Sequence, residues 1–201
     1  GDTVAVIGAG PIGILHAELA RARGAGKIFL LNRSRNRLDG ARDLSYDAYI
    51  ETGAAGGVQE VLSRTDGRGA DVVIVTAGSA AAMAAGIAMT ARMGRVSLFA
   101  GLPQGTPLLP LDVNFIHYRQ IALYGAFSSA PHHNVRALDL IRSGQVRAAR
   151  ILTHAVRLDD ITHGFALVEQ RTGLRVAVIP NMGETADALA RHPEIVLSKR
   201  R

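Results

Sequence analysis

The fold is decided by residues 3–13, which read TVAVIGAGPIG. Residues 3–7 form a short apolar run typical of a strand, and residues 8–13 have the spacing G-x-G-x-x-G. A helix is predicted over residues 11–23, because apolar side chains recur there at helical spacing and Pro11 suits a first turn. A second strand is predicted at residues 27–31. This strand–turn–helix–strand order is the context in which the glycine motif binds a dinucleotide.

Each glycine of the motif has its own expected role. Gly8 permits the tight turn out of the strand, Gly10 lets a pyrophosphate approach the backbone, and Gly13 lets helix and strand pack closely. The N–H groups at the helix start, with the positive end of the helix dipole, favour a phosphate there. A glycine-rich turn without a ligand is the alternative interpretation.

Short apolar runs alternate with helical stretches along most of the chain, which indicates repeated strand–helix units. Further strands are expected at residues 48–50, 71–75, 95–99, 121–124 and 174–179, and further helices at 34–44, 58–64, 80–91, 113–119 and 135–142. The run at 71–75 does not alternate, so we expect it to be buried on both faces of its sheet. The predicted fold class is α/β, a three-layer, doubly wound parallel sheet of the Rossmann type.

The regular alternation predicts one cofactor-binding domain over residues 1–145. Residues 150–157 are expected to be irregular, and a helix follows with Leu158, Ile161, Phe165 and Val168 on one face. Residues 181–201 are expected to form a polar, basic tail with one short helix. Because the chain opens with glycine and enters a strand almost at once, we expect it to be a piece of a longer polypeptide. A processed or tagged end is the alternative.

The composition limits the class of protein. The 201 residues are 48% hydrophobic and 20% charged, which suits a packed domain and excludes general disorder. No apolar run approaches the roughly 18–20 residues of a membrane span, so no membrane association is expected. The chain has no cysteine, which excludes disulfides and thiolate–metal sites within it and suits a reducing compartment such as the cytoplasm.

The net charge of +6 raises the question of nucleic-acid binding. The 23 basic residues are almost all arginine and are spread along the chain, while aromatic residues for base stacking are few, at five Phe and four Tyr. We therefore expect no nucleic-acid partner and interpret the charge as a general bias in composition.

The residue at the end of the second strand is expected to contact the adenosine ribose. An acidic residue there favours NAD and repels the 2′-phosphate of NADP. This chain has Asn32 instead, followed by Arg33, Ser34, Arg35 and Arg37. Asparagine keeps a hydrogen bond without the repulsion, and arginines can pair with a phosphate. NADP is therefore favoured over NAD, with solvated arginines and a weaker NAD contact as the alternative.

Three further strand ends are candidate parts of the site, since ligands lie beyond the carboxyl ends of strands in an open parallel sheet. They are residues 76–79, 100–102 and 125–128. Each turns on small residues, which leave room for a nucleotide. Ordinary turn chemistry is the alternative for each one taken alone.

No pattern in the chain predicts a metal site, a nucleophile or an acid–base pair. His132 and His133 are adjacent but have no Cys, Asp or Glu at ligand spacing. His16 lies beside the apolar stripe of the first helix and is expected to pack or face solvent. The sequence contains no Walker A lysine, no G-x-S-x-G and no H-E-x-x-H.

The sequence resembles the cofactor-binding half of the zinc-dependent medium-chain alcohol, polyol and threonine dehydrogenases. The resemblance covers residues 1–180 in order and with family-like spacing. It rests on GDTVAVIGAGPIG at 1–13, GRGADVVI at 67–74, GRV at 94–96, FAGLP at 99–103, LDVNFIHY at 111–118, ILTH at 151–154 and GLRVAVIP at 173–180. The segment at 114–118 is most similar to a bacterial sugar- or polyol-dehydrogenase branch.

The resemblance also implies which residues contact the cofactor. They are Gly8, Gly10, Pro11, Ile12 and Gly13 at the pyrophosphate; Asn32 and Arg33 at the adenosine ribose; Thr76, Ala77 and Gly78 on the adenine side; Ala100, Gly101, Leu102, Ala126, Phe127 and Ser128 beside the nicotinamide; and Arg175 near the pyrophosphate. Two departures from the family pattern stand out. Asn32 replaces the usual Asp, and Ser45 replaces the glycine that ends the second helix in a left-handed conformation.

The function implied is that of the NAD(P)-binding part of an oxidoreductase that moves hydride between a secondary alcohol or polyol and nicotinamide. In the family, zinc is held by a preceding catalytic domain, to which residues 146–180 return. This chain is thus expected to supply the cofactor but not the Lewis acid, and to be inactive alone. A zinc-free quinone or enoyl reductase and a non-catalytic NAD(P) sensor are the alternatives. A homo-oligomer formed by edge-to-edge sheet pairing is also open.

Overall fold

The computed structural model describes residues 1–53, 57–170, 172–180 and 195–197, with residues 196 and 197 described by their backbone alone. The chain divides into two compact units, Gly1–Val146 and Arg147–Arg201. In the described part of the chain, no helix is long and apolar enough to cross a membrane.

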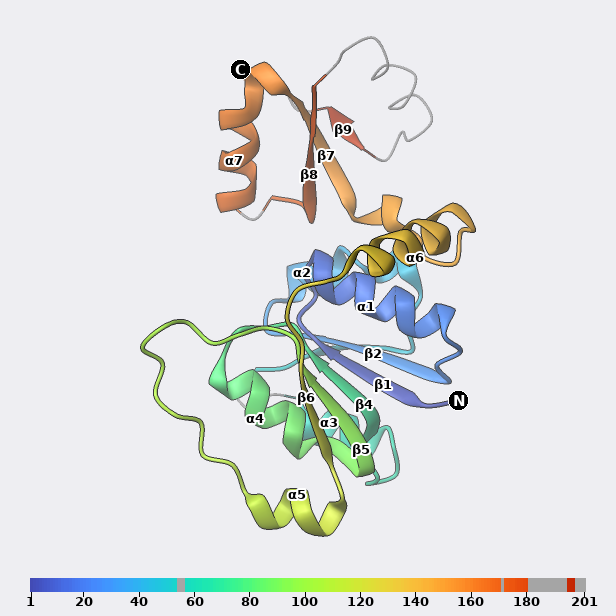
Figure 1. The fold of residues 1–201 in the computed structure, drawn as a ribbon, viewed down its shortest axis with the longest axis vertical. Coiled ribbons are helices and arrows are strands. Elements are labelled where there is room, and N and C mark those ends of the chain that lie inside the picture. The colour runs from blue at the N-terminus through green and yellow to red at the C-terminus, as the bar shows by residue number, and fades with distance from the viewer. Residues whose placement is uncertain (54–56, 171, 181–194, 198–201) are drawn as a thin grey trace. The chain divides into compact units, whose positions relative to one another are not determined.

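The first unit is built on a six-stranded sheet in the order β3-β2-β1-β4-β5-β6 (Figure 1). Every neighbouring pair is parallel. The strands are β1 (Thr3–Ile7), β2 (Lys27–Asn32), β3 (Ala48–Glu51), β4 (Ala70–Val75), β5 (Thr90–Leu98) and β6 (Ala122–Gly125). This order confirms the predicted doubly wound α/β fold of the Rossmann type.

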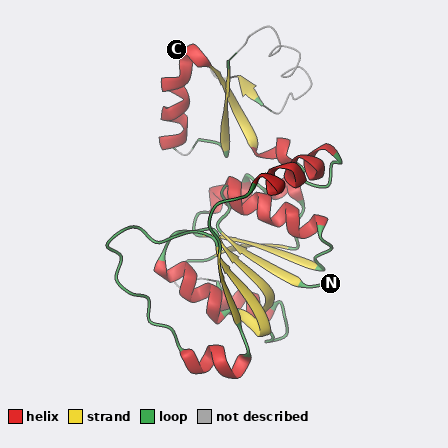
Figure 2. Cartoon of the chain, in the orientation of Figure 1, coloured by secondary structure: helices red, strands yellow, loops and turns green. Residues whose placement is uncertain are grey.

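Helices cover both faces of this sheet and complete three layers (Figure 2). They are α1 (Pro11–Ala22), α2 (Arg35–Asp39), α3 (Val58–Ser63), α4 (Ala80–Ala88) and α5 (Val113–Arg119). The unit also contains α6 (Pro131–Arg142), none of whose residues is buried. On one face, Val61 of α3 and Met83 of α4 join the main apolar core with alternate residues of the strands. On the other, α1 and α2 bury Ile14 and Leu38.

Two carboxylates fasten strands of this sheet near their amino ends. Oδ2 of Asp71 accepts the N–H of Thr3 at 2.8 Å, and Oδ2 of Asp47 accepts the N–H of Ile28 at 2.7 Å. These bonds satisfy strand N–H groups that the ladders leave over, because a buried backbone donor needs a partner.

The helix predicted over residues 34–44 is split in the structure. α2 ends at Asp39, and after Gly40 the chain forms the short 3-10 helix η1 (Arg42–Leu44). Ser45 follows with a φ of 56°, the left-handed conformation that is usually given to glycine. The predicted helix at 80–91 is shorter, because the chain enters β5 at Thr90.

The second unit has a small parallel sheet in the order β8-β7-β9. Its elements are η2 (Ala148–Ile151), β7 (Leu152–Arg157), η3 (Leu158–Asp160), α7 (Ile161–Glu169), β8 (Arg175–Ile179) and β9 (Val196–Leu197). The prediction of irregular structure at 150–157 was therefore wrong, because β7 occupies most of it. The short helix expected beyond Pro180 falls largely on residues outside the described ranges.

The apolar face predicted for α7 is not the face that it buries. Phe165 and Val168 are exposed at 63% and 59%, whereas Gly164 and Leu167 are buried. Gly164 explains the choice, because a Cβ there would lie 2.9 Å from Cγ2 of Val156 in β7. The helix packs through its smallest residue, which a count of apolar side chains does not reveal.

We predict that Gly86→Ala destabilises the first unit. Alanine in an open helix interior is better than glycine by about 1 kcal/mol. A Cβ at Gly86, however, would lie 2.7 Å from Cγ2 of the buried Val75, and overpacking of this kind costs about 1–3 kcal/mol. Urea unfolding followed by circular dichroism measures the change. Gly40→Ala is the control and should be neutral or stabilising, because its Cβ would meet nothing closer than 3.6 Å. A gain in stability from Gly86→Ala would contradict the close contact of α4 with β4.

Candidate cofactor-binding site

The strand order reverses between β1 and β4, so the crevice beyond their carboxyl ends is where an open α/β sheet places a ligand. Gly8 follows β1 directly, and Thr76 follows β4. The N–H of Thr76 donates to the carbonyl of Ile7 at 2.9 Å, so the two strand ends are joined at this crevice.

The glycine-rich loop turns tightly at this point. Gly8 has a φ of +117°, a conformation that side chains with a Cβ rarely adopt. A Cβ at Gly13 would overlap the carbonyl oxygen of Gly8, so α1 approaches the loop as closely as two backbones can. At Gly10, by contrast, a Cβ would meet no atom within 4 Å. The loop is therefore packed at both ends and open in its middle.

The open part of the loop presents unused hydrogen-bond donors. α1 is capped by Gly10 without a side-chain hydrogen bond, and its first turn holds no acidic residue. Among the described residues, nothing accepts a hydrogen bond from the N–H of Gly10, Ile12 or Gly13. Free N–H groups and the positive end of a helix dipole together form a seat for an anion such as a pyrophosphate.

Asn32, at the end of β2, is tied to this loop rather than free beside it. Its Oδ1 accepts the N–H of Ala9 at 3.2 Å, and its Nδ2 donates to the carbonyl of Ser34 at 2.9 Å. An aspartate could make the first of these bonds but would set a second acceptor against the Ser34 carbonyl. The amide therefore suits this turn, a role that the residue type alone did not reveal.

The arginines after Asn32 differ in the charges around them. Arg35 lies 3.7 Å from Asp39 and 4.0 Å from Glu51, which absorb part of its charge. Arg33 is exposed and makes no ion pair or hydrogen bond with another described residue. Arg37 is partly buried within α2. Of the three, Arg33 is the guanidinium that pairs with no other described residue.

The other predicted strand ends are brought together to different degrees. A Cβ at Gly78 would lie 2.8 Å from the carbonyl oxygen of Gly101, so the loops after β4 and β5 touch. The segment after β6 lies at the edge of the sheet, where the Phe127 side chain is fully exposed and Ser128 has a φ of 63°. Arg175 begins β8 in the second unit, where its backbone pairs with Leu152.

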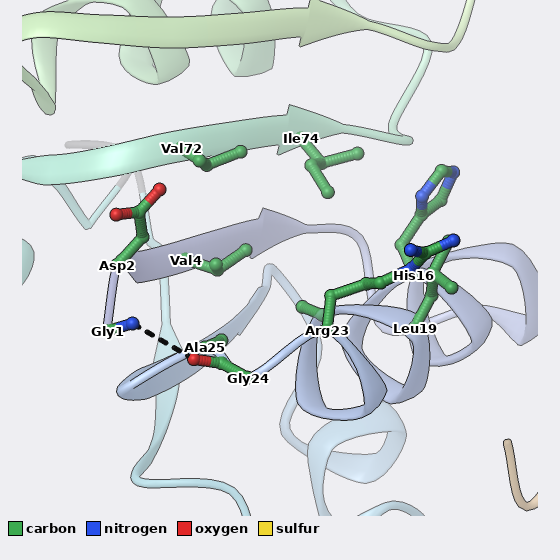
Figure 3. A pocket seen from close by; sticks show the side chains of 11 residues that line it. Gly1, Asp2, Val4, His16, Leu19, Arg23, Gly24, Ala25, Val72 and Ile74 are labelled. Atoms are coloured by element: carbon green, nitrogen blue, oxygen red, sulfur yellow. Dashed lines mark hydrogen bonds between the residues drawn. The ribbon is translucent and has the colours of Figure 1, made fainter. Parts of the chain in front are cut away.

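A groove that the sequence did not predict lies along β1 and β4, from Gly1 and Asp2 at their amino ends to Ile74 and His16 (Figure 3). It has a volume of about 370 Å³, and its walls are largely apolar. It is lined by Gly1, Asp2, Val4, His16, Leu19, Ala20, Arg23, Gly24, Ala25, Val72 and Ile74. None of the glycine-rich loop or of the strand ends belongs to it, so we do not assign it to the dinucleotide.

His16 is a partly buried titratable side chain that lines this groove. Its ring packs edge-on against Phe99 at 4.6 Å between ring centres. Burial lowers the pKa of His16, because desolvation disfavours the charged imidazolium. In the described part of the chain, no three side chains of His, Cys, Asp or Glu gather as metal ligands would.

The fold and the loop together define an α/β domain of the Rossmann type, the architecture in which such a loop commonly binds a dinucleotide. The family described as zinc-binding dehydrogenase matches residues 11–143. The chain belongs to this family, as the resemblance in the sequence predicted.

Individual relatives agree. The chain is 31% identical over 183 residues to a sorbitol dehydrogenase of Bacillus subtilis (strain 168), which covers 90% of this chain and 51% of that protein. The alcohol dehydrogenase TADH of Thermus sp. ATN1 superposes with a TM-score of 0.79 and 29% identity, over 89% of this chain and 51% of that one. A protein of Sinorhizobium meliloti 1021, assigned as a zinc-binding dehydrogenase and bound to NADP, superposes with a TM-score of 0.77 and 29% identity. The match covers 90% of this chain and 53% of that one. The chain thus spans about half the length of these relatives.

The lowered pKa of His16 predicts a pH dependence of stability. Below its ordinary pKa of about 6.5, the unfolded chain takes up a proton that the folded chain resists, so this group costs stability as the pH falls. We predict that the drop in Tm between pH 7.5 and pH 5.5 is smaller in His16→Gln than in the unmodified chain. His117→Gln, at an exposed position, is the control and should leave the drop as it is. An equal drop in all three proteins would show that burial of His16 has no such effect.

Proposed function

We propose that this chain is the nicotinamide-dinucleotide-binding part of an oxidoreductase, which transfers hydride between a secondary alcohol or polyol and the cofactor. The observation that carries the proposal is the open donor group of Gly10, Ile12 and Gly13 at the reversal of strand order. The names of the relatives, sorbitol dehydrogenase and alcohol dehydrogenase, support the substrate class. We place its action in the cytoplasm, because a chain without cysteine suits a reducing compartment.

In this proposal the chain binds and orients the cofactor. The loop donors hold the pyrophosphate, and Asn32 with Arg33 meets the adenosine ribose. The nicotinamide then extends toward the loops after β5 and β6, where Ala100, Gly101 and Leu102 and, further out, Ala126, Phe127 and Ser128 border it. Thr76, Ala77 and Gly78 line the crevice between. We propose that Arg175 contributes to pyrophosphate binding only in the whole protein.

The family name implies zinc, and the described residues do not fit it. They bring no three ligating side chains together, and the sequence has no cysteine. A zinc ion that polarises an alcohol needs about three protein ligands. We therefore propose that the ligands belong to a part of the whole protein that this chain does not include.

We further propose that NADP is preferred over NAD. Asn32 carries no charge to repel a 2′-phosphate, and Arg33 is exposed and makes no ion pair with another described residue. The NADP found in the S. meliloti relative, at 29% identity, is consistent with this choice. Glu51 is paired with Asn32 across β2 and β3 and could repel a 2′-phosphate, but its carboxylate lies 4.0 Å from the guanidinium of Arg35.

Titration of the 201-residue chain with NADPH and NADH, followed by nicotinamide fluorescence, tests the function. We expect saturable binding of both and tighter binding of NADPH. With sorbitol, threonine or 2,3-butanediol and added zinc, we expect no reduction of either oxidised cofactor. Absence of dinucleotide binding would overturn the proposed function, and tighter binding of NADH would overturn the preference.

We predict that Arg33→Ala weakens NADPH binding by about tenfold, since a hydrogen bond between charged groups contributes about 1.5–3 kcal/mol. NADH binding should change by less than about twofold, because NADH lacks the 2′-phosphate. Arg92→Ala removes another exposed arginine, from β5, and serves as the control. Equal losses for NADPH and NADH in Arg33→Ala would show that Arg33 does not read the phosphate.

A further inference from the structure

Thr76 stands at the centre of the crevice, but its hydroxyl faces the protein backbone. Oγ1 lies 3.0 Å from the carbonyl oxygen of Ile7 and 3.3 Å from that of Gly8. Both neighbours are acceptors, so the single hydroxyl proton is donated to Ile7 and shared with Gly8. The family resemblance places this residue on the adenine side of the cofactor, whereas the geometry gives its proton to the glycine-rich loop.

The same oxygen lies against both close-packed glycines of the loop. A Cβ at Gly8 would collide with Oγ1 of Thr76, and a Cβ at Gly13 would lie 3.1 Å from it. The Gly8 carbonyl that Thr76 contacts is also the one against which Gly13 packs. The hydroxyl therefore touches the point where the end of β1, the turn and the first turn of α1 meet.

This contact has a consequence for the phosphate seat. The N–H of Gly13 is one of the open donors, and its position depends on where the Gly8 carbonyl lies. On the β2 side of the loop, Asn32 holds the N–H of Ala9 at 3.2 Å. On the β4 side, only Thr76 among the described side chains bonds to a loop carbonyl. A loop held from both sides loses less conformational freedom when an anion binds, and this raises affinity.

We propose that Thr76 is a positioning residue, which holds the glycine-rich loop in its pyrophosphate-binding conformation through the carbonyls of Ile7 and Gly8. The inference rests on the proposed dinucleotide function and deepens it. It assigns Thr76 an effect on the pyrophosphate rather than a contact with the adenine.

Four variants of the 201-residue chain test this role. Thr76→Val and Thr76→Ala both remove the hydroxyl, the first keeping the size of the side chain and the second leaving no group against the carbonyls. Thr76→Ser restores the donor without the methyl group. Thr90→Val is the matched control, because Oγ1 of the buried Thr90 donates to the carbonyl of Gly86 at 2.7 Å at the start of β5, outside the crevice.

The measurements are the dissociation constants for NADPH, and for ADP and adenosine by competition against NADPH. We expect Thr76→Val and Thr76→Ala to weaken the binding of NADPH and of ADP by about three- to tenfold, which is the effect of one neutral hydrogen bond. Adenosine binding should stay within about twofold, and Thr76→Ser should recover most of the loss. Thr90→Val should lower Tm without changing the affinity for NADPH.

Thr76→Val and Thr76→Ala both lack the hydroxyl, and each is judged if it folds. The proposal is overturned if these folded variants bind ADP as tightly as the unmodified chain does. It is also overturned if adenosine binding is weakened as much as ADP binding, because that would indicate a contact with the adenine. Failure of Thr76→Ser to recover the affinity would overturn it as well. Failure of the unmodified chain to bind NADPH is a different result, because it removes the proposed function itself.

Discussion

The structure depends on one close contact, the packing of Gly13 at the start of α1 against the carbonyl of Gly8. This contact sets the angle at which α1 leaves the loop and lets it lie along β1 and β2. The N–H groups of Ile12 and Gly13 in the first helical turn have no acceptor among the described residues. The arrangement that packs the helix on the sheet is therefore the one that prepares a seat for an anion.

Polar side chains from the two strands beside β1 hold this loop from opposite sides. Asn32 comes from the end of β2 and Thr76 follows β4, and each bonds to the backbone of the loop rather than to another side chain. If the proposed function holds, Asn32 links cofactor selection to the geometry of the loop. A change from amide to carboxylate there would alter the charge near the ribose and the bond to Ser34 together.

Much of the fold could be predicted because its signals are local. The apolar runs, the spacing of Gly8, Gly10 and Gly13 and the turn residues all lie within a few positions of one another. What sequence reasoning missed depends on contacts between distant segments. The groove beside His16 exists only once β1, β4 and α1 are assembled, and the bond between Asn32 and Ala9 spans 23 positions. The buried face of α7 was missed because Gly164, not an apolar stripe, decides it.

The central claim is that the backbone donors of the glycine-rich loop bind the pyrophosphate of the cofactor. An amide NMR titration of the chain with NADP tests it most directly. The account predicts that the N–H signals of Gly10, Ile12 and Gly13 shift and exchange more slowly with solvent, while that of Ala9, already bonded to Asn32, changes less. The contradicting result is that these three signals stay unchanged while those of residues lining the groove, such as His16 and Leu19, respond.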